Sequence, residues 1–411
     1  MPLEPNGERV SERRPHELPD IPALTDAIQK DLNELVICLS HSWGGLEQVA
    51  ANDSIDRGAL GLKVRVLCLE GSPLHEYLVH RKEVVVLPLN FRPRDNFDLK
   101  MRAELYRLID EGTNVVHAHQ TSLLGSISPW LWGRHRVCLF ASRHIMNKHD
   151  KRNFFHRAIY GRIDYLIVMS QALRENVMNT HPLRERQVKV VNLGLDFDRF
   201  DPDKVDPKKQ RALWGADDDT VVIGMVGRID PAKGQATFIK AAAGLLKRLR
   251  EDEKLKFIIV GEETLGSSSA HLEELKEMVT QFHLEDHVVF AGYQENIPEV
   301  MRAFDIFVMP SRQEAFGLVA IEAMAMECPI VISRGGSASE IVGDEEFGRI
   351  MRPEDAFDLQ RHLRFLLDSP MERIQMGQAA RAHVIKHYDR KVRLGMTLAL
   401  YERAMRKRKW I

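Results

Sequence analysis

The sequence contains the stretch Glu314-Ala315-Phe316-Gly317-Leu318-Val319-Ala320-Ile321-Glu322, which joins a predicted strand to a predicted helix. The strand is the apolar run at residues 305–309. Helix-forming and apolar residues continue over 318–326, and Pro329 requires the helix to stop. The helix therefore begins near Gly317, where free N–H groups, the positive end of the helix dipole and a glycine backbone suit a phosphate.

Two carboxylates flank this predicted anion site. Glu314 lies on the loop before the helix, and Glu322 lies about one turn inside it, with seven residues between them. Because carboxylates accept hydrogen bonds from hydroxyl groups, the pair indicates a ligand with a diphosphate between two sugars. The alternative is that Glu314 is simply solvated and Glu322 is a first-turn acid favoured by the helix dipole.

Length and composition indicate a globular protein with more than one core. At 411 residues, and about 150 residues per domain, the chain predicts two or three domains. With 44% hydrophobic and 28% charged residues and a formal net charge of -1, it has no general attraction to nucleic acid. Four widely spaced cysteines predict small buried side chains in a reducing, cytoplasmic compartment, not a disulfide framework or a zinc site. They are Cys38, Cys68, Cys138 and Cys328.

No segment predicts membrane insertion. Residues 1–30 form a polar, partly disordered tail without the apolar core of a signal peptide. The longest apolar stretch, residues 123–141, is interrupted by proline, glycine and arginine and falls short of the ~20 apolar residues that a span needs. We therefore expect a soluble protein.

Short β-rich runs alternate with helical patterns in two series, which predicts two doubly wound parallel-sheet domains. The first series of strands is expected at residues 35–39, 64–69, 84–87, 114–117, 137–141, 165–169 and 188–191. A turn-rich segment with Asp and Pro between residues 192 and 207 reads as a linker. The second series is expected at residues 221–226, 256–260, 288–290, 306–309 and 330–332.

The second series opens with two cations beside glycines. Gly227-Arg228 ends a predicted strand, and Lys233-Gly234 precedes a predicted helix. Arginine can hold a phosphate with two parallel N–H bonds and lysine supplies a point charge, so the pair could bind a diphosphate. The Gly-x4-Gly-Lys-Ser/Thr pattern of a P-loop is absent. Alternatively, both are surface cations around an ordinary turn.

Taken together, these cations and the Glu-x7-Glu segment about 80 residues later resemble the retaining GT-B glycosyltransferases of the large group 1 or family 4 type. That family includes lipopolysaccharide, mannosyl and sucrose-type transferases, and the resemblance covers residues 34–405. Further segments that fit it are Gly44–Glu47, 115–119, Arg143-His144, 192–196, Phe200, Val260-Gly261, Gly335-Gly336 and 340–342.

The resemblance implies the GT-B fold, with two Rossmann-like domains facing across a cleft and a C-terminal helix crossing back to the first. We then expect a tail at 1–30, an acceptor domain at 31–198, a donor domain at 199–388 and a crossover helix with a basic end at 389–411. The activity implied is a hexosyltransferase that takes a sugar from a UDP- or GDP-sugar and requires no cofactor or metal.

Residue roles follow by the same resemblance. The residues expected to act in catalysis are Arg228, Lys233, Glu314 and His144. The residues expected to bind the donor are Gly44, Gly45, Gly227, Arg228, Lys233, Tyr293, Phe316, Gly317, Leu318 and Glu322. The cations and helix amides would stabilise charge on the leaving diphosphate. Retention would arise from attack on the leaving-group face or, less favoured, from double displacement through Glu314.

The acceptor is expected in the N-terminal domain. Residues 142–160 are unusually basic, which suits a phosphorylated or acidic glycan or lipid-linked acceptor in lipopolysaccharide or polysaccharide synthesis. The residues assigned to it are His119, Arg143, Lys148, Lys151 and Arg152. A second basic cluster, residues 406–410, predicts either peripheral contact with the anionic inner face of the cytoplasmic membrane or a solvated helix end.

Other interpretations remain open. His117 and His119 could suggest a metal, but no third ligand is apparent, and the Asp196-Phe197-Asp198 segment falls in the linker. A nucleotide-sugar epimerase or a noncatalytic sugar-nucleotide-binding subunit could use the same architecture. A dinucleotide dehydrogenase is less favoured because Ser42-Trp43-Gly44-Gly45 does not match Gly-x-Gly-x-x-Gly.

Overall fold

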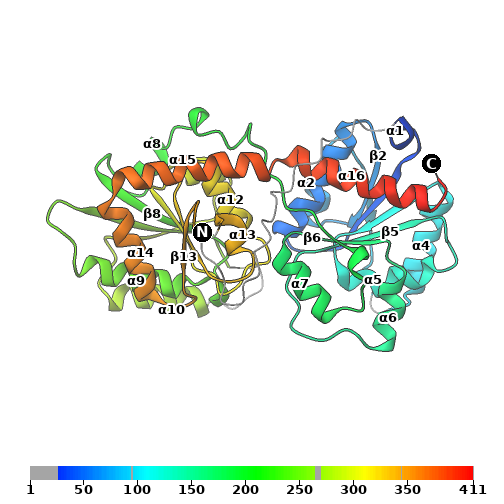
Figure 1. Cartoon of the computed structure of the whole chain (residues 1–411), viewed down its shortest axis with the longest axis horizontal. Helices are drawn as coiled ribbons and strands as arrows, with labels where there is room; N and C mark the ends of the chain where they lie inside the picture. Colours follow the sequence, from blue (N-terminus) through cyan, green and yellow to red (C-terminus); the bar gives the residue numbers. More distant parts are fainter. Residues whose placement is uncertain (1–25, 94–95, 264–269, 344, 411) are drawn as a thin grey trace, which may run out of the picture.

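The computed structural model describes residues 26–93, 96–263, 270–343 and 345–410, and shows two α/β domains lying side by side (Figure 1). Each domain has a sheet of parallel strands joined through helices, which confirms the predicted fold class. Of the tail predicted at residues 1–30, residues 1–25 lie outside the described residues, and helix α1 occupies Asp26–Asp31.

The N-terminal domain is built on seven parallel strands in the order β3-β2-β1-β4-β5-β6-β7. Strand β1 is buried at five of its six positions, as expected for an apolar strand covered on both faces. The strands are β1 (Asn33–Cys38), β2 (Lys63–Leu69), β3 (Val85–Leu89), β4 (Val115–Ala118), β5 (Cys138–Arg143), β6 (Tyr165–Val168) and β7 (Val188–Val190). The helices are α2 (Gly45–Ala59), α3 (Pro73–Leu78), α4 (Leu99–Asp110), α5 (Leu124–Ile127), α6 (Phe154–Gly161) and α7 (Gln171–Thr180).

The C-terminal domain has six parallel strands in the order β10-β9-β8-β11-β12-β13. They are β8 (Thr220–Val226), β9 (Lys254–Val260), β10 (Val288–Gly292), β11 (Ile306–Met309), β12 (Ile330–Ser333) and β13 (Arg349–Met351). The helices are α8 (Lys208–Leu213), α9 (Gln235–Leu246), α10 (Ala270–Gln281), α11 (Ile297–Arg302), α12 (Leu318–Ala325), α13 (Ala338–Val342), α14 (Ala356–Asp368) and α15 (Pro370–His387). The sequence did not predict β13, the edge strand of this sheet.

The chain passes between the domains twice at one place. The first crossing, near Leu195, forms a parallel bridge with Asp389 at the second crossing. Leu195 donates its N–H to the carbonyl of Tyr388 (2.8 Å) and accepts from the N–H of Arg390 (3.1 Å). After this point α16 (Arg390–Lys407) continues from α15 onto the N-terminal domain (Figure 1).

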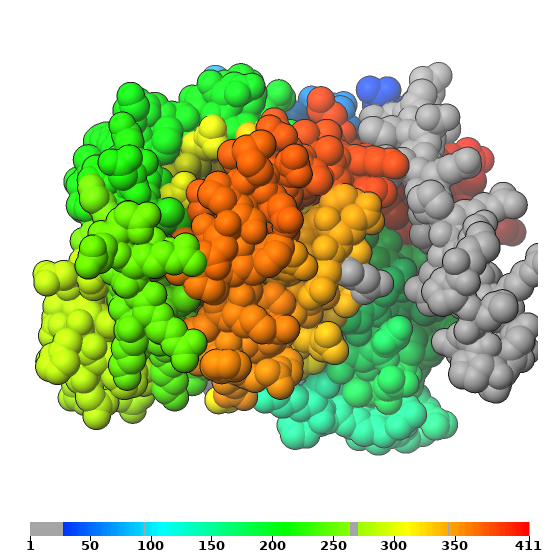
Figure 2. Space-filling model, turned by 60° about the vertical axis from the view of Figure 1, so that its left-hand side comes forward, coloured from blue at the N-terminus to red at the C-terminus, as the bar shows by residue number. Residues whose placement is uncertain are grey.

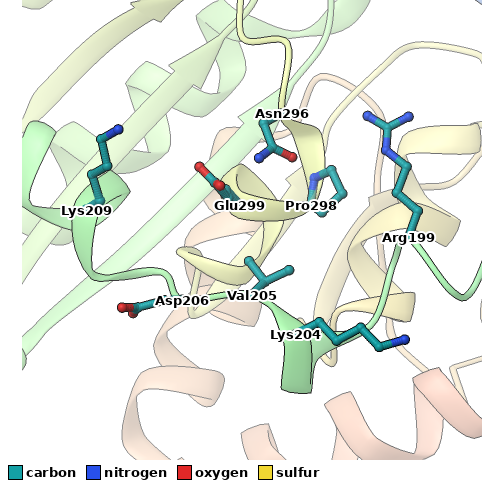
Figure 3. Close-up of a pocket in the computed structure, with 8 residues that line it drawn as sticks. All are labelled: Arg199, Lys204, Val205, Asp206, Lys209, Asn296, Pro298 and Glu299. Carbon is teal, nitrogen blue, oxygen red and sulfur yellow. The ribbon is translucent and has the colours of Figure 1, made fainter.

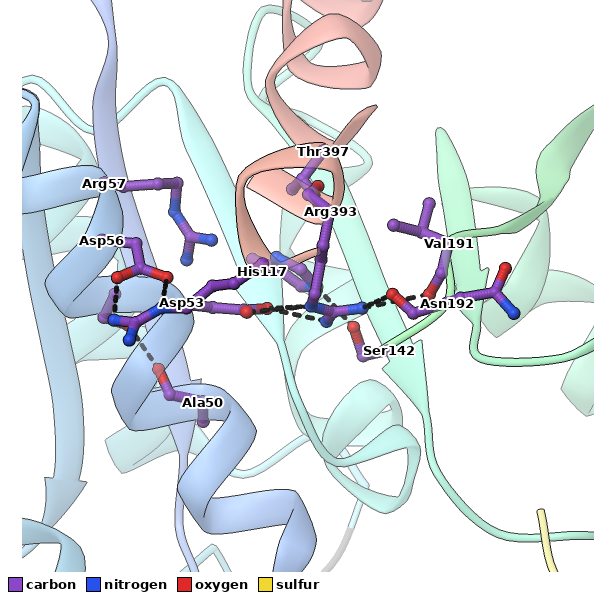
Figure 4. A network of polar contacts seen from close by, with 12 residues as sticks. Ala50, Asp53, Asp56, Arg57, His117, Ser142, Val191, Asn192, Arg393 and Thr397 are labelled. Atoms are coloured by element: carbon purple, nitrogen blue, oxygen red, sulfur yellow. Dashed lines mark hydrogen bonds and ion pairs between the residues drawn. The ribbon is translucent and has the colours of Figure 1, made fainter. Parts of the chain in front are cut away.

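Helix α16 is held to the N-terminal domain by buried charged groups (Figure 4). Arg393 pairs with Asp53 of α2 (2.7 Å) and donates to the carbonyls of Val191 and Asn192 (3.0 and 3.1 Å). Burial alone would raise the pKa of Asp53, but the Arg393 guanidinium outweighs it and lowers the pKa to about 2. The ion pair therefore remains charged inside the protein.

A second buried pair lies beside the first. Arg57 on α2 donates from Nε to the carboxylate of Glu34 on β1 (2.6 Å), and both side chains are almost fully buried. The Tyr401 hydroxyl of α16 donates to the same carboxylate (2.6 Å). Two segments separated by more than 300 residues in sequence thus share one polar cluster in the core.

The end of α16 packs on the same domain. Arg408 pairs with the buried Asp164 (2.8 Å), and the Trp410 indole donates to the carbonyl of Arg136 (2.6 Å). The guanidinium of Arg136 lies over the Trp410 ring, 4.4 Å from its centroid. Two members of the basic cluster considered for membrane contact are therefore engaged with the protein itself.

Cys38, Cys68, Cys138 and Cys328 are all free and buried, as their sequence context predicted. Within the described residues, no helix is both long enough and apolar enough to cross a bilayer.

Candidate functional site

The strand order reverses once in each sheet, between β1 and β4 and between β8 and β11. Ligands of open parallel sheets bind outside the carboxyl ends of the strands at such a reversal. The predicted site residues follow these four strands, with Gly45 after β1, His119 after β4, Lys233 after β8 and Glu314 after β11. The topology therefore brings them to the expected ends of the two sheets.

Helix α12 begins directly after Gly317, as predicted. Gly317 has a left-handed backbone (φ 81°), and a Cβ at this position would lie 2.9 Å from the Cε of Met309 at the end of β11. A side chain is excluded there by both conformation and space. The glycine thus lets the chain turn sharply from the loop into the helix and presents the N–H groups of the first turn.

Lys233 and Glu314 meet across the strand reversal. The Lys233 ammonium lies 2.6 Å from Glu314 Oε1, and both side chains are mostly buried. For this contact to form, the backbone at Gly234 (φ 80°) lies close to the backbone at Pro310. A Cβ at Gly234 would lie 2.3 Å from the carbonyl oxygen of Pro310. Arg228 is exposed, and its carbonyl accepts from the side-chain amide of Gln235 (2.7 Å).

The loop that carries Glu314 is fixed by its backbone. A Cβ at Gly336 (φ 56°) would lie 1.7 Å from the carbonyl oxygen of Glu314, so only glycine fits. Ser337 donates its hydroxyl to the carbonyl of Phe316. Phe316 itself is buried and lies edge-on to Tyr388 (5.8 Å between ring centroids). The loop therefore holds Glu314 on a rigid support.

Glu322 on α12 has an unusual protonation state. Its side chain is partly exposed, yet desolvation of its carboxyl by the surrounding protein raises the pKa to about 7, against a weaker opposing effect of Arg199. Neutral and ionised forms are both populated near pH 7. A titrating carboxyl beside a predicted anion site is typical of a functional group.

In the N-terminal domain, Gly44 and Gly45 form the start of α2. The Gly44 N–H donates to the side chain of Glu47 (2.9 Å), which fixes the turn. A Cβ at Gly45 would meet no atom within 4 Å, so the backbone is open on that side. A ligand could approach this helix start closely.

Three histidines stack at the ends of β4 and β5. The ring centroids of His117 and His119 are 4.5 Å apart, and those of His119 and His144 are 5.8 Å apart. Burial, assisted by neighbouring positive charges, lowers the pKa of all three rings well below the usual value. They are therefore neutral at physiological pH.

The partners of the three rings differ. His117 contacts Tyr401 Oη through Nδ1 (2.6 Å) and Ser142 Oγ through Nε2 (2.8 Å), so both of its nitrogens are occupied. His119 is fully buried, and neither of its ring nitrogens has a hydrogen-bond partner among the described residues. The same holds for His144 Nε2. Within the described residues, no group of three or more His, Cys, Asp or Glu could hold a metal ion.

The residues assigned to the acceptor follow β5. Arg143 is partly buried and donates to Thr121 Oγ1 (2.7 Å) and to the carbonyl of Ile145 (2.7 Å). Burial lowers the pKa of Lys151. Lys148 is exposed, and Arg152 forms an exposed pair with Asp150 (2.7 Å). Three of these four cations belong to the loop that follows β5. Arg143, the last residue of β5, is held at the start of that loop by its hydrogen bonds to Thr121 and Ile145.

Direct hydrogen bonds join the domains beside the Glu314 loop. Ser170, which caps α7 in the N-terminal domain, donates its hydroxyl to the carbonyl of Ala315 (2.6 Å). Glu340 on α13 accepts from the N–H groups of Gln171 and Ala172 (2.8 and 2.9 Å). A carboxylate at a helix N-terminus is stabilised by the helix dipole. We call this set of contacts the α7 latch.

Replacing Glu340 with alanine should open the two domains. Hydrogen bonds to a charged acceptor contribute about 1.5 kcal/mol, so the closed arrangement should lose population by about tenfold relative to an open one. Small-angle X-ray scattering should then show a larger radius of gyration than for the unchanged protein or for Glu346→Ala, an exposed acid of the same domain. An unchanged scattering profile would show that the latch does not hold the domains together.

A cavity of about 420 Å³ lies between the interdomain linker and the start of α11 (Figure 3). Its lining residues are Arg199, Lys204, Val205, Asp206, Lys209, Asn296, Pro298 and Glu299. None of the residues predicted to bind the donor lines it. Tyr293, which precedes α11, has an exposed side chain and donates its N–H to Glu262 (3.2 Å).

Sequence reasoning missed Ser170, Ser337 and Arg199. Ser170 could have been recognised as a helix cap from Ser before a helical pattern, but its contact with a backbone carbonyl of the other domain has no sequence signature. Glu340 was noted as part of the family pattern without a role. Its contacts with α7 give it one.

Comparison with known proteins adds independent findings. Residues 43–199 match the model of Glycosyltransferase Family 4, and residues 206–383 match that of Glycosyl transferases group 1. The chain is 33% identical over 226 residues to D-inositol 3-phosphate glycosyltransferase 2 of Catenulispora acidiphila, covering 54% of this chain and 52% of that protein. It is 39% identical over 170 residues to the lipopolysaccharide core biosynthesis mannosyltransferase LpsB of Rhizobium meliloti, covering 40% and 46%. The matches thus span about half the length of these curated relatives.

Solved structures share the whole fold. A glycosyltransferase from Rickettsia africae superposes with a TM-score of 0.82 at 17% identity, covering 91% of this chain and 99% of that one. Anabaena HepE in complex with UDP-glucose gives a TM-score of 0.76 at 20% identity, covering 90% and 99%.

Proposed function

The chain belongs to the group 1 glycosyltransferases of family 4, and we propose that it transfers a sugar from a nucleotide-diphosphate sugar to a glycan or lipid-linked acceptor with retention of configuration. The observation that carries this proposal is the meeting of Lys233 and Glu314 (2.6 Å) at the start of α12. It combines a cation, a hydroxyl acceptor and free helix amides at one strand reversal, which is what a sugar diphosphate requires.

The donor would lie with its diphosphate between the two domains. Lys233, Arg228 and the first-turn amides of α12 would bind the phosphates from one side, and the open backbone at Gly45 would approach from the other. Glu314 would accept from sugar hydroxyls and Glu322 from ribose hydroxyls. The structure of HepE with UDP-glucose supports a UDP-sugar as the first donor to try.

A phosphorylated acceptor is supported by the basic loop after β5 and by the relatives' names. One of these acts on D-inositol 3-phosphate, and another serves lipopolysaccharide core synthesis. Lys148, Lys151 and Arg152 provide cations in that loop, and Arg143 lies at its base. His119 and Nε2 of His144 are buried and have no hydrogen-bond partner among the described residues, so they could contact a hydroxyl or phosphate only if the structure opened around them.

In the proposed reaction, the bond between the anomeric carbon and the diphosphate oxygen breaks, and its electron pair stays on the diphosphate. The acceptor oxygen bonds to the same face of that carbon, and its proton passes to the departing phosphate. Lys233, Arg228 and the amides of α12 stabilise the negative charge that develops on the leaving group. No residue needs to change its covalent state.

Double displacement through Glu314 is the competing mechanism. Its carboxylate is held at 2.6 Å by the Lys233 ammonium, and the loop behind it is fixed at Gly336 and Ser337. An ion-paired carboxylate on a rigid loop suits hydroxyl binding better than attack on carbon. We therefore favour attack from the leaving-group face.

Thermal unfolding with UDP, GDP, ADP and their common sugars tests the proposal, because a ligand that binds only the folded chain raises its stability. A stabilising nucleotide sugar should then be consumed in the presence of lipid-linked or phosphorylated glycan acceptors, with an α-linked product from an α-linked donor. Isomerisation of the sugar without acceptor would instead indicate an epimerase. Binding without any turnover would indicate a sugar-nucleotide-binding subunit.

Donor affinity should depend on pH through Glu322. Because its pKa is raised to about 7, the carboxyl must lose a proton below pH 7 before it can accept as a carboxylate. Affinity should fall by up to about tenfold per pH unit below 7 and level off above it. A nucleotide sugar suits this measurement better than a free nucleotide does. A free nucleotide has a terminal phosphate with a second pKa of about 6, which would itself titrate in the same pH range. Calorimetry should show a flat profile for Glu322→Gln, whereas a flat profile in the unchanged protein would remove this role.

A further inference from the structure

Helix α6 turns an apolar face away from the N-terminal domain. Asn153 caps this helix by accepting from the N–H of His156 (2.9 Å), which fixes its start at Phe154. Helical spacing then gives two faces. Ile159 and Tyr160 enter the core. The outer face carries Phe154, Arg157, Ala158 and Gly161, and Phe154 is 87% exposed.

Other aromatic residues extend this face. The ring centroids of Phe97 and Phe155 are 6.0 Å apart, and the two side chains are 49% and 37% exposed. The Trp132 indole, also 49% exposed, donates to the carbonyl of Ala158 on α6 (3.3 Å). We call Phe97, Trp132, Phe154 and Phe155 the α6 patch. Contiguous exposed aromatic residues of this kind mark an interaction surface.

Positive charge predominates in the segment that leads into α6 and in its first turn. Residues 145–157 carry four cations, Lys148, Lys151, Arg152 and Arg157, and one acid, Asp150. Asp150 is occupied by Arg152 (2.7 Å), whereas the side chains of Lys148 and Arg157 are exposed. Aromatic rings that are rimmed by basic side chains match the interface of a bilayer with anionic lipids.

We propose that the α6 patch docks the protein peripherally on an anionic lipid bilayer, with its aromatic rings among the headgroups and Lys148 and Arg157 over lipid phosphates. Residues near 150 (aquamarine) lie along the lower edge of the molecule, whereas the red end of the chain lies in its upper part (Figure 2). The docking surface thus differs from the C-terminal basic cluster, whose Arg408 and Trp410 bind the protein itself.

This inference adds a location to the proposed function, since a lipid-linked acceptor would lie at the same surface. Its test nevertheless needs neither sugar nor acceptor. The full chain is floated with vesicles of phosphatidylcholine alone or with added phosphatidylglycerol. We expect binding only to the anionic vesicles, with salt weakening it.

Replacing Phe154 and Phe155 together with serine should lower the vesicle partition coefficient by about tenfold or more, because two rings no longer leave water. Phe357→Ser is the matched control, since Phe357 is a 67% exposed phenylalanine of the C-terminal domain. Arg157→Glu provides a second variant that keeps the rings and should also weaken binding. Equal partitioning of all these variants would overturn the proposal.

Two further outcomes would also overturn it. Displacement from vesicles by inorganic phosphate at constant ionic strength would show a phosphate site and not a bilayer surface. Sedimentation that shows a dimer, converted to a monomer by the serine variant, would show an interface between two copies. Thermal stabilisation by a nucleotide sugar is measured on the same samples. If it persists without vesicle binding, the docking proposal fails, whereas the donor binding that the proposed function requires is retained.

Discussion

Replacing Lys233 with alanine should lower the turnover number by about two to three orders of magnitude, which is the usual effect of removing one group that stabilises transition-state charge. The ammonium is 2.6 Å from Glu314, and we assign it to the leaving diphosphate. Its removal leaves developing charge uncompensated and frees the carboxylate that binds the sugar. Steady-state kinetics with a nucleotide sugar and direct donor binding would measure the two effects separately.

The control for this variant is Lys240→Ala, an exposed lysine on α9, the helix that follows Lys233, and it should retain full turnover. Arg228→Ala should reduce turnover in the same direction as Lys233→Ala. If binding of the donor weakens while the turnover number is unchanged, Lys233 serves ground-state binding only. Turnover at the level of the unchanged protein would remove it from the mechanism.

Replacing Arg57 with methionine should destabilise the protein by about 3–5 kcal/mol, the usual result of leaving one buried charge without its partner. The Glu34 carboxylate is fully buried and would retain, among the described residues, the hydrogen bond from the Tyr401 hydroxyl and a 4.0 Å contact with the neutral His117 ring, but no cation. Because Tyr401 belongs to α16, the attachment of that helix should weaken as well. Urea unfolding followed by tryptophan fluorescence and circular dichroism would measure the loss.

Two further variants test whether the unpaired charge causes this loss of stability. Replacing Glu34 with leucine in the Arg57→Met background should recover much of the stability, because no buried charge is then left unpaired. Arg107→Met, which breaks exposed pairs with Glu104 and Glu111, should have little effect. A full loss that persists in the double variant would assign it to packing.

The sequence patterns predicted the strands well where an apolar run is buried. Every strand from β1 to β12 lies in or next to a predicted run. Strand β13 was missed because it has only three residues, Arg349-Ile350-Met351, and pairs with a single neighbouring strand at the edge of the sheet. Strand β5 continues beyond its predicted end because the backbones of Ser142 and Arg143 still pair with β6. Periodicity detects side-chain burial and not backbone pairing.

The roles assigned to the site residues stay predictions, but the sequence did indicate some of the local structure around them. Gly317 and Gly234 could be singled out from the sequence because glycine is the residue that most readily adopts the left-handed backbone found at both positions. The family resemblance gave Lys233 and Glu314 separate roles toward the donor, and their direct contact was not predicted, since no local rule joins residues that are 81 positions apart. The pKa of Glu322 and the α7 latch depend on how the domains pack. Neither can be inferred from local sequence.

The crossing of α16 means that the N-terminal domain is synthesised before the C-terminal domain but is completed after it. Its core includes Leu398, Tyr401, Ala404 and Met405 from the final turns of the chain. At ribosomal rates of about 5–20 residues per second, a nascent N-terminal half would wait roughly 10–40 seconds for them. The C-terminal domain therefore has the opportunity to fold first, and chaperones would meet a growing polypeptide whose N-terminal domain still exposes the apolar residues that α16 later covers.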